Sequence, residues 1–194
     1  MFVDICIPKN NEEEFIKIAQ RLGTKKLLFL YDKKEKDLKE LQKTTKIKLF
    51  SGLIDSQKDN SLNFAIGERK NVENKKIKFL YGFENLEQKD SLHYRRSGIN
   101  QVIGKLIKNK EKILVIDMEK IFEKKNNSML LGRIQFNLRM AKKYKLNLII
   151  ASFAKKPRNL RSGKDYEALI RTLGYQEEAK KAVNTLNQVL EFSE

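Results

Sequence analysis

Histidine, cysteine and tryptophan are nearly missing from this chain of 194 residues, which holds one histidine, one cysteine and no tryptophan. Cys6 lies inside an apolar run, so neither a disulfide framework nor a Cys-x-x-Cys metal site can form, and we expect a reducing compartment. Metal-dependent hydrolases on β/α barrels usually gather several imidazoles with carboxylates around their ions, whereas His93 is alone here. The shortage argues against metal-centred hydrolysis.

Long apolar runs and several well-known motifs are absent as well. No stretch approaches the roughly 18 apolar residues of a membrane span, and the opening segment carries acids where a signal peptide needs a basic start. The sequence has no GxxxxGK[ST] phosphate loop, no GxGxxG after a strand and no GxSxG elbow. We therefore expect a cytoplasmic protein that neither binds membranes nor hydrolyses nucleotides.

Short apolar runs rich in Ile, Val, Leu and Phe recur along the chain, each of strand length, with helical patterns between most of them. This alternation predicts an α/β fold: a TIM-barrel-like (β/α) barrel, closed or incomplete, with about seven parallel strands. An open doubly wound sheet is the alternative. With two prolines and no low-complexity linker, residues 1–194 are expected to form a single barrel-like domain. The expected strands are Phe2 to Ile7, Lys26 to Tyr31, Ile47 to Ile54, Asn63 to Ile66, Ile77 to Phe83, Ile113 to Met118 and Leu146 to Ser152.

Capping residues predict where the main helices begin. Ser97 is expected to cap a helix through Lys108, and Ser128 a long helix to about Tyr144. Ser162 with Asp165 three residues later resembles a capping box. Asp32 is expected to cap a more polar helix that runs through Gln42.

Acidic residues are too few to balance the charge: 41 Lys+Arg stand against 25 Asp+Glu, a formal net charge of +16. A solvated Lys/Glu surface explains many lysines but not this excess, which attracts polyanions. Residues 124–164 contain no Asp or Glu and twelve Lys or Arg. Nucleic acid is the expected partner.

The candidate contacts with RNA or a protein partner come from three basic elements. Arg139, Lys142 and Lys143 lie opposite the apolar stripe of the long helix, and the loop KKPRNLRSGK follows a strand. Such loops lie at the carboxyl-end rim of a β/α sheet, where ligands bind, and guanidinium groups suit phosphates. The third element, HYRRSGIN, precedes a helix start. The ten candidates are Arg95, Arg96, Arg133, Arg139, Lys142, Lys143, Lys155, Lys156, Arg158 and Arg161, and no catalytic or metal-binding residue is assigned.

Acids near strand ends leave one alternative open. Asp4, Asp55, Glu84 and Asp117 have the oxygen ligands that a magnesium site requires, although helix caps, turns and lysine partners are their commoner roles. His93 is more often a packing or phosphate-contacting residue than a catalytic one.

Three consecutive segments resemble the ribonuclease P protein component 3 family, archaeal relatives of the eukaryotic thirty-kilodalton subunit. They are HYRRSGINQVIGKLIK, LLGRIQFNLRMAKKYKLNLIIASFA and PRNLRSGKDYEALIRTLG. The most specific motif is R-x-S-G-I/L-N, present here as Arg95, Ser97, Gly98, Ile99 and Asn100. The opening MFVDICIP is similar too, so the resemblance covers nearly the whole chain, most weakly over 33–90. The chain departs from the family pattern at ASFA, residues 151–154, where Ser-Gly-Ala is expected.

This resemblance implies a TIM-barrel-like fold, related to metal-dependent phosphoesterase barrels but without their metal-binding histidines. It also implies a protein subunit of ribonuclease P that supports the catalytic RNA while precursor tRNA loses its 5′ leader. The RNA would perform the endonuclease reaction with magnesium, and the protein would bind no cofactor. The implied partners are the ribonuclease P RNA, precursor tRNA, an RRM-like protein subunit in a heterodimer or heterotetramer, and other ribonuclease P proteins. The competing function is a stand-alone metal-dependent phosphoesterase that uses Asp4, Glu84, His93 and Asp117.

Overall fold

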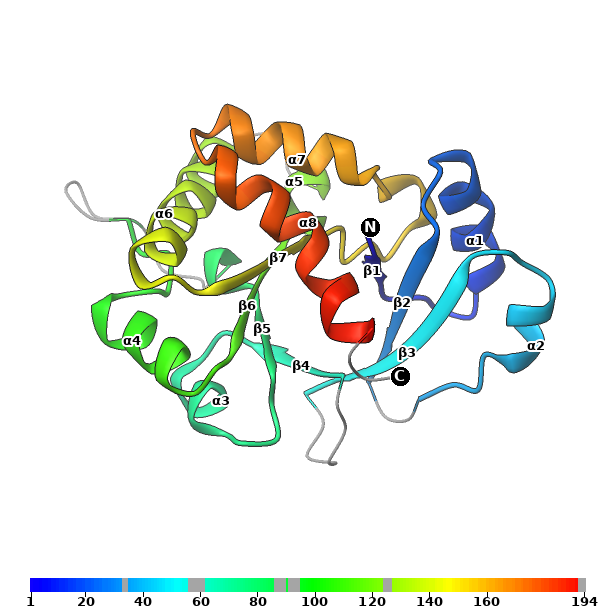
Figure 1. Ribbon diagram of the computed structural model, residues 1–194, viewed down its shortest axis with the longest axis horizontal. Helices are drawn as coiled ribbons and strands as arrows, with labels where there is room; N and C mark the ends of the chain where they lie inside the picture. The colour runs from blue at the N-terminus through cyan, green and yellow to red at the C-terminus, as the bar shows by residue number, and fades with distance from the viewer. Residues whose placement is uncertain (33–34, 56–61, 86–89, 91–94, 124–126, 192–194) are drawn as a thin grey trace.

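Seven parallel strands form one sheet in which each strand pairs with its neighbours in chain order. The computed structural model describes residues 1–32, 35–55, 62–85, 90, 95–123 and 127–191 (Figure 1). The strands curve into an incomplete TIM-barrel-like α/β fold, which confirms the predicted architecture. The strands are β1 (Asp4–Cys6), β2 (Lys26–Tyr31), β3 (Lys48–Ile54), β4 (Asn63–Ile66), β5 (Phe79–Tyr81), β6 (Ile113–Asp117) and β7 (Asn147–Ala151).

The two edges of the sheet meet just beyond β7 rather than along its length. The carboxylate of Asp4 accepts a hydrogen bond from the backbone N–H of Ser152 at 2.8 Å, and Ser152 Oγ donates to the carbonyl of Ile5 at 2.9 Å. A parallel bridge joins Cys6 to Ala154, and Ile7 N donates to Ala154 O. The loop that follows β7 is therefore fastened to the first strand of the barrel.

Alternate strand residues fill the barrel interior, as expected for strands with two covered faces. Leu28, Leu30, Val115 and Ile149 belong to this inner cluster, together with stacked rings of Phe64 and Phe79 whose centroids lie 4.3 Å apart. Helix α8 (Gln176–Glu191) lies across the strands in Figure 1 and adds Leu186 and Leu190 to the same cluster.

The other strand residues pack outward against helices in two outer clusters. Helix α1 (Glu12–Arg21) buries Phe15 and Ala19 against the outer face of β2.

None of the helices within the described ranges is both long and apolar enough to span a membrane. The remaining helices are α2 (Lys39–Lys43), α3 (Arg69–Glu73), η1 (Phe83–Asn85), α4 (Gln101–Asn109), α5 (Glu119–Glu123), α6 (Ser128–Tyr144), η2 (Pro157–Asn159) and α7 (Gly163–Thr172).

Three of the four predicted helix starts need correction. Asn100, not Ser97, caps α4 through its side chain, which accepts from Ile103 N at 2.9 Å. Asn127 holds the cap position before α6, where Ser128 is already the first helical residue. The predicted helix from Asp32 to Gln42 is wrong in extent, because α2 begins at Lys39; residues 33–34 lie outside the described ranges. The Ser162–Asp165 capping box is confirmed at the start of α7.

Candidate nucleic-acid interface

The loop after β7 places a group of cations on the rim at the carboxyl ends of the strands. Lys155, Lys156 and Arg158 are exposed, whereas Leu160 is buried in the cluster that also holds Phe15 of α1. Arg161 is half-buried: its Nη1 donates to the carbonyls of Arg158 and Leu160, at 3.0 Å and 2.7 Å. Three of the four predicted loop cations therefore face solvent, and Arg161 stabilises the loop that carries them.

A buried acid fixes this basic loop to the neighbouring strand connection. Glu119, at the start of α5, is 3% exposed, and its carboxylate accepts from Lys155 N and Asn159 Nδ2 at 3.3 Å. The guanidinium of Arg161 also stacks over the Phe122 ring, 4.4 Å from its centroid. Both contacts tie the loop to α5, so the backbone that carries the cations is already fixed before any ligand binds. Residues 124–125, two further basic positions of the sequence, lie outside the described ranges.

The segment before α4 carries a second basic pair on the same rim. Arg95 and Arg96 are both exposed, and Arg96 N donates to Asp90 Oδ1 at 2.9 Å. The guanidinium of Arg95 lies directly over the Cα of Gly132, where a Cβ would overlap it. A glycine at 132 is thus what lets this arginine lie against the first turns of α6. His93 lies outside the described ranges.

Arg133 requires a correction, since the structure places it in the interior rather than on a surface. It is 4% exposed, and its Nε and Nη2 both approach Asp90 Oδ1, at 3.0 Å and 2.9 Å. Its Nη1 donates to the carbonyl of Glu84 at 3.3 Å. Arg133 therefore joins α6 to η1 and to the segment that carries Arg95 and Arg96, and it does not present its charge to RNA.

The three cations of α6 lie on a different part of the molecule from the rim. Helix α6 bonds to Glu84 of η1 through Arg133 and Asn137. Its three exposed cations lie in the last two turns, toward the start of β7: Arg139, Lys142 and Lys143. All three are exposed; Arg139 lies over the Phe136 ring at 4.7 Å, and Lys142 is 3.8 Å from Glu178 of α8. Along a helix that rises about 1.5 Å per residue, they begin about 17 Å from its first residue. The ten predicted residues thus form a rim group, an outer helix group and one interior residue.

The buried acids do not come together as a metal site. Within the described residues, no group of three or more His, Cys, Asp and Glu side chains could hold a metal ion. The carboxylate of Asp4 joins β1 to the loop after β7 by accepting a hydrogen bond from Ser152 N, and burial raises the pKa of Asp4 to about 7. Asp55 lies in a separate hollow. Only Glu84 and Asp117 of the four predicted acids interact directly: Glu84 Oε1 accepts from Asp117 N at 2.9 Å.

Glu84 and Asp117 connect buried segments of the barrel, and the pKa values of both acids are raised. Glu84 is fully buried, and burial together with the charge of Asp117 raises the pKa of Glu84 to about 8. Burial likewise raises the pKa of Asp117 to about 6. Asn137 of α6 donates to Glu84 Oε2 at 3.3 Å, so the acid connects η1, β6 and α6 beneath the rim.

We predict that Glu84→Gln weakens the pH dependence of stability. An acid whose pKa is higher in the folded than in the unfolded state destabilises the fold as pH rises. The stabilising contribution of this acid is complete below about pH 4.5 and is lost as pH rises through 8, at up to about 1.4 kcal/mol per pH unit. Urea unfolding is measured at pH 5, 6.5 and 8. As pH rises, the free energy of unfolding should fall less for Glu84→Gln than for the wild type. Glu177→Gln, at an exposed site, is the control; a wild-type-to-E84Q difference that stays constant with pH contradicts the prediction.

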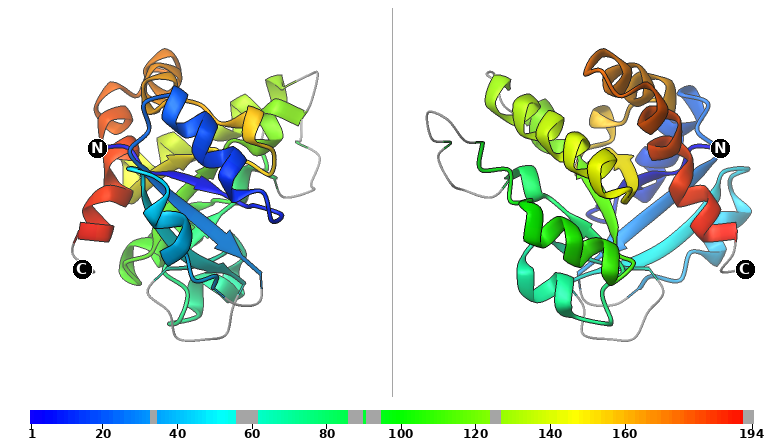
Figure 2. Two further views of the ribbon diagram at one scale, coloured as in Figure 1. Left: turned by 90° about the vertical axis from the view of Figure 1, so that its right-hand side faces the viewer. Right: turned by 60° about the vertical axis from the view of Figure 1, so that its left-hand side comes forward.

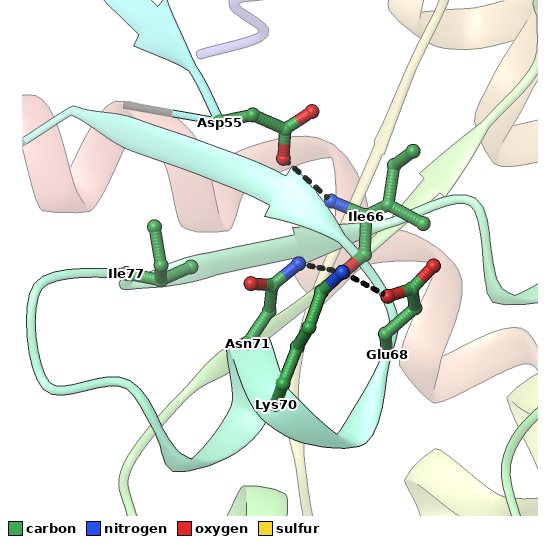
Figure 3. A pocket seen from close by; sticks show the side chains of 6 residues that line it. All are labelled: Asp55, Ile66, Glu68, Lys70, Asn71 and Ile77. Atoms are coloured by element: carbon green, nitrogen blue, oxygen red, sulfur yellow. Dashed lines mark hydrogen bonds and ion pairs between the residues drawn. The ribbon is translucent and has the colours of Figure 1, made fainter. Parts of the chain in front are cut away.

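A hollow of about 250 Å³ between β4 and α3 is a poor candidate for RNA (Figure 3). Asp55 accepts from Ile66 N at 3.3 Å, Lys70 pairs with Glu68 at 2.8 Å, and Asn71 donates to Ile66 O at 2.9 Å. Its lining holds two acids and one lysine. The hollow is therefore acidic, its polar groups bind one another, and it is not part of the interface.

Two cations that the sequence interpretation missed lie beside the basic loop. Lys17 and Arg21 of α1 line a hollow shared with Lys156 and Arg158, and Figure 2 shows η2 next to α1. Nothing in the sequence connects residues about 140 positions apart, although Lys17 and Arg21 do recur at the i, i+4 spacing of one helix face.

Comparisons with known proteins agree on the fold. No known protein-family model matches the sequence, and no match was found among curated proteins. The chain superposes on one from a cryo-EM structure of archaeal ribonuclease P with mature tRNA, at a TM-score of 0.79 and 21% identity, over 98% of this chain and 90% of that one. It also superposes on histidinol phosphate phosphatase from Lactococcus lactis, solved with zinc, L-histidinol and phosphate, at a TM-score of 0.58 and 13% identity. That match covers 92% of this chain and 93% of the phosphatase. Both likenesses establish the barrel fold.

Proposed function

We propose that this protein is a subunit of ribonuclease P that binds the catalytic RNA and supports removal of the 5′ leader from precursor tRNA. The observation that carries the proposal is the rim: five exposed cations on two anchored segments, on a fold shared with a chain of archaeal ribonuclease P. These cations are Arg95, Arg96, Lys155, Lys156 and Arg158.

The rim suits a folded RNA backbone better than single-stranded bases. The ring of Phe122 lies under Arg161, and Phe153 is buried in the barrel, so neither ring beside the basic loop offers an open face to a base. Closely spaced cations lower the repulsion between packed phosphates, so the RNA needs less magnesium to fold and to engage its substrate. In this proposal the magnesium is bound by the RNA, and no residue of this chain is catalytic.

The remaining partners follow from the same proposal. The outer cations Arg139, Lys142 and Lys143 would contact either another part of the RNA or an RRM-like protein subunit, in a heterodimer or heterotetramer. A stand-alone phosphoesterase is the rival, supported by the likeness to histidinol phosphate phosphatase. Metal-dependent turnover of a chromogenic phosphodiester by the purified chain, abolished by Asp117→Ala, would favour the rival.

A salt titration of RNA binding tests the proposal. If the five rim cations each neutralise one phosphate, log affinity should fall with log salt at a slope of about −3.5 to −4.5. The ribonuclease P RNA and a duplex DNA of equal length are compared at about 0.15 M salt. Tighter binding to the RNA with this slope supports the function, whereas equal binding to duplex DNA contradicts it.

A further inference from the structure

A hollow of about 530 Å³ lies between the outer face of α1 and the η2 turn, to the side of the rim. Lys17 and Arg21 form one wall, and Lys156 and Arg158 form the other. The apolar side chains of Ile18 and Pro157 also line the hollow. We call this hollow the α1–η2 groove.

The four cations of the groove are exposed, and none forms an ion pair with any of the described residues. One acid, Glu14, also lines the groove, one helical turn before Lys17. Among the residues that the structure describes, the groove therefore has an excess of three positive charges, and self-repulsion favours an anionic occupant.

The groove is preformed, because one core holds both of its walls. Phe15 and Ala19, on the inner face of α1, share a buried cluster with Ala154 and Leu160, which flank η2. Glu119 fixes η2 independently through Asn159. A ligand between the walls would not have to order the backbone first, which reduces the entropic cost of binding.

We propose that the α1–η2 groove binds a stretch of RNA phosphate backbone, extending the RNA path from the loop after β7 onto α1. The proposal rests on the function proposed above. Each phosphate of a backbone carries non-bridging oxygens in two directions, so one strand can meet cations on both walls at once. Lys156 and Arg158 belong to both the rim loop and the groove, so a backbone bound at the rim continues directly into the groove. None of the described residues that line the groove is aromatic, so the groove suits backbone rather than bases.

The test is the full-length Lys17→Ala/Arg21→Ala variant, with Lys180→Ala/Lys181→Ala as a control that removes two exposed helical cations elsewhere. Removing two phosphate contacts should make the salt slope for the ribonuclease P RNA shallower by about 1.4 to 1.8, a loss of affinity of about 20-fold at 0.15 M salt. The Lys180→Ala/Lys181→Ala variant should change the salt slope and the RNA affinity by much less. Equal melting temperatures confirm that both variants are folded.

Three outcomes separate the possibilities. In the first outcome, the wild type binds the RNA with a steep dependence on salt, and the groove variant has the same affinity and salt slope. The groove proposal is then wrong and the proposed function stands. If the wild type itself shows no preference for the RNA, the proposed function fails. If the variant keeps its RNA affinity but loses binding to polyglutamate, the occupant is an acidic protein and the groove proposal is overturned.

Discussion

Arg133→Met is expected to lower the free energy of unfolding by about 3 kcal/mol, more than any substitution of an exposed cation. Arg133 is 4% exposed and ties three segments together through Asp90 and the Glu84 carbonyl. Burial opposes ionisation of Asp90, but hydrogen bonds from Arg133 and from Arg96 N outweigh it and hold the pKa of Asp90 below its usual value. Removing the guanidinium leaves that carboxylate without its charged partner, a change that typically costs about 3–5 kcal/mol for buried pairs. The lower figure applies because the Asp90 side chain is 19% exposed.

Urea denaturation of the wild type, Arg133→Met and Arg139→Met measures this effect. Arg139 lies on the same helix but is exposed, so its replacement should change stability by no more than about 0.5 kcal/mol. A loss below about 1 kcal/mol for Arg133→Met would show that the pair with Asp90 contributes little to stability and would contradict the prediction.

Charge reversal of the rim loop is expected to have the largest effect on RNA binding. Lys155→Glu, Lys156→Glu and Arg158→Glu together remove three exposed cations and add three repelling charges. Losing three phosphate contacts alone makes the salt slope shallower by about 2.1 to 2.7 and lowers affinity about 100-fold at 0.15 M salt. The backbone contacts with Glu119 use Lys155 N and not its side chain, so the melting temperature should stay near that of the wild type.

The matched variant reverses Arg139, Lys142 and Lys143 on the outer part of α6. We expect it also to weaken RNA binding without unfolding the protein, which would extend the RNA path beyond the rim. Unchanged RNA binding with a normal melting curve would remove the α6 face from the RNA site. A rim-loop variant that binds RNA as tightly as the wild type would contradict the proposed interface itself.

The strand pattern and the barrel were predictable from the sequence because buried parallel strands leave continuous apolar runs. Runs such as Lys26 to Tyr31 match their strands residue for residue. Helix starts were less predictable, since Ser97, Asn100 and Ser128 are all plausible caps by residue type and tertiary packing decides among them.

The candidate site was only partly predictable, because charge in a sequence carries no information about burial. Arg133 lies in an acid-free stretch, yet its partner Asp90 is 43 positions away and only folding brings them together. Lys17 and Arg21 were missed for the same reason, because their neighbours in the groove come from η2. The rim loop was predictable because a basic segment directly after a buried strand has only one place to lie in a β/α barrel.

We propose that this barrel acts on precursor tRNA only through the RNA that it binds. Reconstituted cleavage of precursor tRNA by the ribonuclease P RNA and its partner proteins, with and without this chain, tests it most directly. We expect that adding the wild-type chain lowers the magnesium concentration needed for cleavage, and that the variant with Lys155, Lys156 and Arg158 reversed to Glu does not. Equal cleavage with and without the chain at every magnesium concentration, or phosphodiester hydrolysis by the chain alone, would contradict it.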